Sequence, residues 1–68
     1  MLPDEEEELH KRLEELRSEH RDLDIVIRQL AESSPVDILR LQRLKKRKLL
    51  LKDSIMKIES MLVPDIIA

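Results

Sequence analysis

The sequence contains no cysteine, no glycine and no aromatic residue. Without cysteine the chain forms no disulfide and no thiolate metal site, and two histidines alone argue against structural zinc. Without glycine it lacks the loops that cradle phosphate groups. Without aromatic side chains it lacks the platforms on which single-stranded nucleic acids stack. We therefore predict no cofactor and no metal.

Long apolar runs are also absent, and no segment approaches the ~18 residues that span a membrane. The N-terminus, residues 1–8, is acidic and lacks the apolar stretch of a secretory signal. These two features predict a cytoplasmic protein without a membrane partner.

Charged residues, by contrast, make up 41% of the 68 residues, together with many leucines and isoleucines. This composition is typical of coiled coils and long helices. Residues 1–32 carry eleven acids and five bases, whereas residues 33–68 carry four acids and eight bases. The opposite net charges of the two halves favour their association. We expect one small domain, residues 1–68, with a core too small to stand alone without self-association.

Leucines recur every seven residues along the first half of the chain. The core positions of this heptad pattern are Leu9, Leu13, Leu16, His20, Leu23, Ile27 and Leu30. A second heptad pattern follows at Leu41, Leu44, Lys48, Leu51, Ile55, Ile58 and Leu62. Apolar residues that alternate in steps of three and four predict two helices that pack as a coiled coil.

Ser33-Ser34-Pro35 separates the two patterns. Ser34 is predicted to cap the second helix, with Pro35 as its first residue and Asp37 completing a capping box. We predict a first helix over about 4–32, a turn at 33–34, a second helix over about 35–63 and a short tail at 64–68. A connection this short favours an all-α, antiparallel two-helix hairpin of the coiled-coil type.

The second helix carries more apolar residues than one packing surface needs. Leu49, Met56 and Val63 form a further seven-residue stripe, and Val26 lies outside the core positions of the first helix. Exposed apolar surface of this kind marks an interface. We predict that these four residues form an oligomer interface. Two hairpins would then make a four-helix bundle, and we favour a dimer over a tetramer.

His20 and Lys48 are polar residues at core positions, and the hairpin places them opposite each other or within one turn. Asp24 lies one turn from His20 and could reach either cation. We interpret His20, Asp24 and Lys48 as a polar layer that specifies helix pairing. The alternatives are a ligand site and a pH-sensitive switch, because histidine titrates near pH ~6.5.

A dense basic run occupies the start of the second helix. Its residues that could contact nucleic acid or an acidic partner are Arg40, Arg43, Lys45, Lys46, Arg47 and Lys52. On a helix they do not share one face. We favour a solvated surface that pairs with acids of the same or a neighbouring chain. The alternative is contact with a phosphate backbone, with little readout of base sequence.

Two segments of the chain carry a family resemblance. The first contains His20, Leu23-Asp24, Ile27 and Leu30, and the second contains Leu44-Lys45-Lys46 and Lys48-Leu49 and continues to Ile55. Together they resemble the YdcH-like family of small bacterial proteins. The resemblance covers roughly residues 15–62 and implies a bacterial cytosolic helical hairpin of unknown function. One departure is Ser54, where the family commonly has Glu before the isoleucine. The resemblance implies that Asp24, Lys45, Lys46, Lys48, Lys52 and Asp53 belong to one pattern.

No serine has an evident partner base, and the sequence has no loop suited to an oxyanion hole. We therefore predict a non-catalytic protein, without catalytic residues, that acts as an oligomeric interaction or scaffold module. Its partners would be a second copy of itself and an unidentified protein. The runner-up is a protein that associates with nucleic acid without sequence specificity through the basic run.

Overall fold

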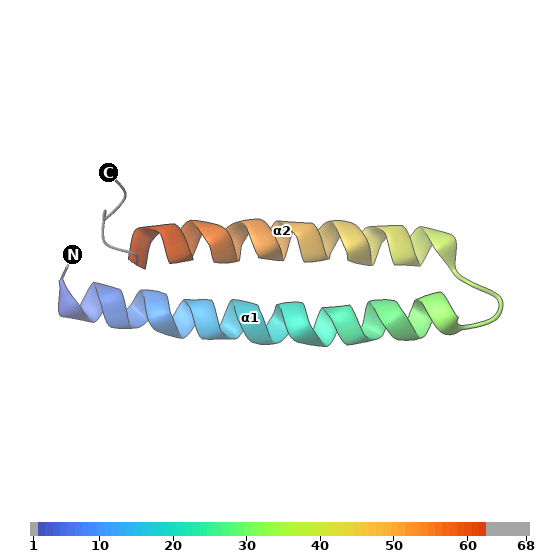
Figure 1. Ribbon diagram of the computed structural model, residues 1–68, viewed down its shortest axis with the longest axis horizontal. Helices are drawn as coiled ribbons and strands as arrows, with labels where there is room; N and C mark the ends of the chain where they lie inside the picture. The colour runs from blue at the N-terminus through green and yellow to red at the C-terminus, as the bar shows by residue number, and fades with distance from the viewer. Residues whose placement is uncertain (1, 63–68) are drawn as a thin grey trace.

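Two antiparallel helices make up the computed structural model, which describes residues 2–62. Helix α1 spans Pro3–Glu32 and helix α2 spans Ile38–Leu62. They lie side by side and are joined at one end by a short linker (Figure 1). The longest dimension, 50 Å, matches the ~45 Å expected for a 30-residue helix. The predicted all-α two-helix hairpin is thus confirmed, and assembly into a bundle stays a prediction.

Helix α1 begins one residue before the expected Asp4 and ends at the expected Glu32. Pro3 lies in the first turn, where a missing N–H costs nothing, and Asp4 to Glu6 place negative charge at the positive end of the helix dipole. At the other end, the hydroxyl of Ser33 donates to the carbonyl of Leu30 at 3.1 Å. That bond satisfies one of the carbonyls left without a partner within the helix.

Helix α2 begins three residues later than predicted, at Ile38 rather than Pro35. Asp37, not Ser34, is its N-cap. The backbone N–H of Arg40 donates to Oδ1 of Asp37 at 3.1 Å, and the N–H of Leu41 donates to the carbonyl of Asp37 at 3.0 Å. An aspartate satisfies a free N–H of the first turn at least as well as a serine, which explains the later start.

The linker is therefore five residues long, residues 33–37, instead of the two-residue turn expected. Its length shifts α2 along α1. Asp24 faces Lys48 and Arg17 faces Glu59. His20 and Lys48 still border the same groove, one turn apart along the hairpin rather than face to face.

The core consists of the predicted heptad positions. Leu13, Leu16, Ile27 and Ile58 are at most 8% exposed, and Leu9, Leu51, Ile55 and Leu62 pack against them. Each fully buried side chain of this kind contributes about 1.5–3 kcal/mol. Four such residues among residues 2–62 make a small core, as expected for a domain of this size.

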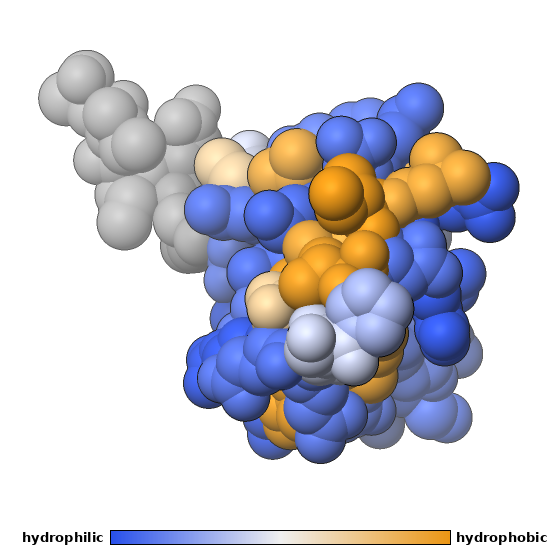
Figure 2. Space-filling model, turned by 90° about the vertical axis from the view of Figure 1, so that its right-hand side faces the viewer, coloured by the Kyte–Doolittle hydropathy of each residue, from blue (hydrophilic) through white to orange (hydrophobic). Residues whose placement is uncertain are grey.

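Large apolar side chains remain on the surface of α2. Leu49 is 62% exposed and Leu50 is 58% exposed, and Ile38, Leu39, Met56 and Met61 are exposed as well. Figure 2 looks at the linker end of the hairpin and shows apolar surface there, bordered by hydrophilic surface. Val36, Ile38 and Leu39 are the exposed apolar residues of the linker and the first turn of α2. No helix within residues 2–62 is long and apolar enough to cross a membrane.

Candidate functional site

Asp24 joins the two helices near the middle of the hairpin. Its Oδ1 accepts a hydrogen bond from Nζ of Lys48 at 2.5 Å, and its Oδ2 accepts one from Arg28 at 2.8 Å. The bond from Lys48, and then the bond from Arg28, hold the pKa of Asp24 below its usual value. Asp24 is therefore a carboxylate held between two cations.

His20 lies one turn before Asp24 on α1 and is partly buried. Its Nε2 is buried and has no hydrogen-bond partner among residues 2–62. Of the predicted polar layer, the structure thus brings Asp24 and Lys48 into contact, while His20 lies beside them without a bond. A pH response at His20 stays a prediction.

A second pair of charges links the helices. Arg17 donates to Oε2 of Glu59 at 2.7 Å, and this bond raises the pKa of Arg17. This pair was not predicted from the sequence. Arg17 directly follows the core residue Leu16, and Glu59 directly follows the core residue Ile58. Positions next to the core commonly carry ion pairs in coiled coils. Their signal was therefore present in the heptad pattern.

The helices enclose a groove of about 610 Å³ on one flank, which we call the central groove. Its base is apolar, and three lysines and one glutamate border it. The lining residues are His20, Ile27, Lys45, Lys48, Leu49, Lys52, Ile55, Met56 and Glu59. A groove of this composition suits an apolar surface that offers a carboxylate to a lysine at its edge.

A smaller groove lies on the other flank and is called the opposite groove. Glu19, Asp22, Leu23, Val26, Arg47 and Leu51 line it. Because each residue of a helix turns by about 100°, Leu49 and Leu50 of α2 fall on different flanks of its core positions. The two grooves therefore lie on opposite flanks of the hairpin, and residues of the predicted oligomer interface are found in both.

Leu49 and Met56 of that predicted interface line the central groove together, whereas Val26 lines the opposite groove. Val63, the fourth residue, lies outside the residues that the structure describes. Only Leu49 and Met56 therefore form a continuous surface within the described hairpin.

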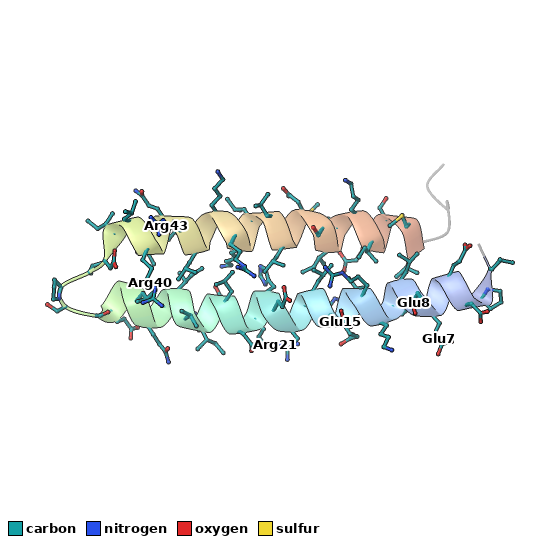
Figure 3. The ribbon with its side chains drawn as sticks, turned by 180° about the vertical axis from the view of Figure 1, so that it is seen from behind. Glu7, Glu8, Glu15, Arg21, Arg40 and Arg43 are labelled. Atoms are coloured by element: carbon teal, nitrogen blue, oxygen red, sulfur yellow. The ribbon has the colours of Figure 1, made fainter. Side chains whose placement is uncertain are left out.

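The basic run is also divided between the flanks. Lys45 and Lys52 line the central groove, and Arg47 lines the opposite one. Arg40 and Arg43 lie near the linker end of α2 (Figure 3). Within residues 2–62, no carboxylate lies within 4.0 Å of the side-chain nitrogens of Arg40, Arg43, Lys45, Lys46, Arg47 or Lys52.

Histidine, aspartate and glutamate are the metal ligands that this sequence offers. In the described part of the chain, no group of three of them could hold a metal ion. The chemistry of the central groove is that of lysine ammonium groups and apolar side chains.

Comparison with known proteins identifies one family. The sequence model of a family described as "Protein of unknown function (DUF465)" matches residues 13–59. The YdcH-like family that the sequence resembles is this same family, so the resemblance is confirmed. Comparison with the curated proteins and with the solved structures gives no significant match.

Proposed function

The chain belongs to the DUF465 family of proteins of unknown function, and we propose that it acts as a non-catalytic interaction module that pairs with a second copy of itself. The observation that carries this proposal is the exposed apolar surface of α2. Leu49, Leu50 and Met56 are each more than half exposed, although they lie in the interior of helix α2 rather than at its ends. Apolar surface on this scale is typical of an interface.

The total surface area supports the same proposal. The chain exposes 5853 Å². A compact monomer of 8.1 kDa exposes ~4,500 Å². The difference exceeds the ~800 Å² that each partner buries in an interface of standard size. One hairpin thus has enough surplus surface to supply its share of a stable dimer.

Two such hairpins would form a four-helix bundle, in which exposed apolar residues of α2 become part of a shared core. The module would act by shape and charge, as a rigid pair of hairpins with a charged outer surface. A further protein partner would then bind the dimer rather than a single hairpin.

Size-exclusion chromatography with light scattering tests self-association on the unmodified chain. The expected mass is twice the 8.1 kDa of one chain. A mass of one chain at micromolar concentration, with full helicity by circular dichroism, would overturn the proposal.

A second function is favoured by one specific observation. Seven of the eight bases of α2, all except Lys48, have no carboxylate within ion-pair distance inside residues 2–62. Arg40, Arg43 and Arg47 could contact a phosphate backbone while Lys45 and Lys52 remain in the central groove. A mobility-shift titration at ~50 mM salt tests this, because phosphate contacts are strongest at low salt. Absence of a shift with duplex DNA, single-stranded DNA and RNA would exclude it.

A further inference from the structure

We propose that the second copy of the chain docks in the central groove with its α2 antiparallel to the first α2, so that a two-fold axis passes beside Lys52. This inference rests on the proposed self-association and adds the face, the direction and the register of the pair.

The spacing of residues along the groove carries the proposal. Leu49 and Met56 lie three residues before and four residues after Lys52, and Lys45 and Glu59 lie seven residues on either side. An antiparallel partner centred at Lys52 therefore sets Leu49 against the partner's Met56. It also sets Lys45 against the partner's Glu59. A parallel partner would instead set each lysine against its own copy.

Lys45 and one carboxylate oxygen of Glu59 are available for the contact between the two copies. Lys45 has no carboxylate within 4.0 Å in the described hairpin, and Glu59 binds Arg17 through Oε2. Oε1 of Glu59 makes no hydrogen bond within residues 2–62, so it can accept one from a second cation. Lys45 of the docked copy supplies that cation.

Charge along the whole hairpin favours the same direction. Residues 18–49, the linker half, carry eight bases and five acids, a net charge of +3. Residues 2–17 and 50–62, the open half, carry five bases and nine acids, a net charge of −4. Figure 3 shows Glu7, Glu8 and Glu15 toward the open end and Arg40 and Arg43 toward the linker end. Antiparallel docking brings the acidic half of each copy onto the basic half of the other.

The position of the axis fits the length of the molecule. Lys52 is about 23 Å from the linker and lies near the midpoint of the 50 Å hairpin, at 1.5 Å per residue. Docking around Lys52 therefore overlaps the two hairpins over nearly their full length. This axis brings the two Lys52 side chains close together, and their flexible stems allow the like-charged ammonium groups to diverge into solvent.

The other flank of α2 is poorly suited to the same arrangement. Its exposed apolar residues are Leu39, Leu50 and Met61, which are centred on Leu50. Arg43 and Lys57 lie on this flank, seven residues on either side of Leu50. An antiparallel partner there would oppose Arg43 to the partner's Lys57, and these like charges would repel.

Single cysteines test this arrangement, because the chain has none of its own. A disulfide needs Cα atoms within ~7 Å. Lys52→Cys is expected to oxidise to a covalent dimer by itself. Lys45→Cys and Glu59→Cys are expected to stay uncoupled alone and to couple when the two variants are mixed. Arg47→Cys, in the opposite groove, is the matched control and should not couple.

Two outcomes overturn the arrangement. Efficient coupling of Lys45→Cys to itself would show a parallel pair, and coupling of Arg47→Cys would show docking on the other flank. Light scattering on the unmodified chain separates these results from failure of the proposed function. A dimer with the wrong coupling pattern defeats only the arrangement, whereas a monomer defeats both.

Discussion

The carboxylate of Asp24 on α1 and the ammonium of Lys48 on α2 meet at 2.5 Å in the middle of the hairpin. Both side chains are about one-third exposed or less, at 27% and 34%. Lys48 occupies a heptad core position, and Asp24 gives it a partner at the edge of the apolar core. The pair therefore favours the register that the linker allows, because a shift by one turn would leave Lys48 without its carboxylate.

Asp24→Asn is expected to lower the melting temperature at pH 7, because it removes the charge that binds Lys48 and Arg28. The effect should depend on pH. The folded state lowers the pKa of Asp24 below its ordinary value of 3.8, so its stabilising contribution is complete above that value. This contribution is lost as the pH falls through the lower pKa of the folded state.

Thermal melts of both proteins from pH 7 down to pH 2 measure this difference. The melting temperatures should converge in the acid range. Asp22→Asn is the control, because Asp22 forms no ion pair within residues 2–62. A constant gap between Asp24→Asn and the unmodified chain at all pH values would contradict the expected role of the charge.

Asp37→Ala is expected to destabilise the chain by about 1 kcal/mol, because it removes the hydrogen bond to the N–H of Arg40. Ser34→Ala is the comparison, since the sequence placed the cap there and the structure does not. It should change the free energy of unfolding by less than about 0.5 kcal/mol. Urea denaturation at one protein concentration measures both. A larger loss for Ser34→Ala would restore the original assignment of the cap.

The heptad pattern predicted the two helices and their core. Leucines and isoleucines that alternate in steps of three and four form one apolar face on each helix, and the two faces pack against each other. The first residue of α2 was harder to predict from the sequence. Ser34 and Asp37 are both good caps, and Pro35 suits a first turn, so local preference alone could not choose between them. The choice fixes the linker length and hence the register between the helices.

The predicted interface residues show a second limit of prediction from sequence, which concerns residues on different helices. Leu49 and Met56 share a helical face by their spacing, and the structure places both in the central groove. Val26 is on the other helix, and its flank depends on how α1 and α2 face each other. Spacing within one helix does not determine that relationship, so Val26 was grouped with residues from which it is separated.

Leu16→Ala should destabilise the hairpin by about 2–5 kcal/mol, because it leaves a cavity at a side chain that is 3% exposed. Ile25→Ala is the control on the same helix. Ile25 is 48% exposed, and its truncation should cost less than about 0.5 kcal/mol. Urea denaturation followed by circular dichroism compares them. Equal losses for the two variants would mean that the heptad positions do not form the core.

His20→Leu is expected to stabilise the chain by about 1–3 kcal/mol at pH 8. The substitution removes a buried ring nitrogen that has no hydrogen-bond partner within the described hairpin and replaces it with a leucine at a core position. The urea midpoint at a fixed protein concentration measures the change. A loss of stability would show that Nε2 gains a partner in the assembled protein. The melting temperature of both proteins at pH 8 and pH 5.5 would then test the histidine switch.

Leu49→Lys and Leu50→Lys distinguish the two flanks of α2 with neighbouring residues of nearly equal exposure, 62% and 58%. If the central groove holds the second copy, Leu49→Lys places a charge against an apolar side chain in both halves of the symmetric interface. Loss of one buried leucine contact is worth about 1.5–3 kcal/mol, so the dissociation constant should rise at least ~10-fold. Leu50→Lys should leave it within ~3-fold, because Leu50 stays in solvent. Sedimentation equilibrium over a dilution series measures both constants. The reverse order of effects would place the interface on the flank of the opposite groove.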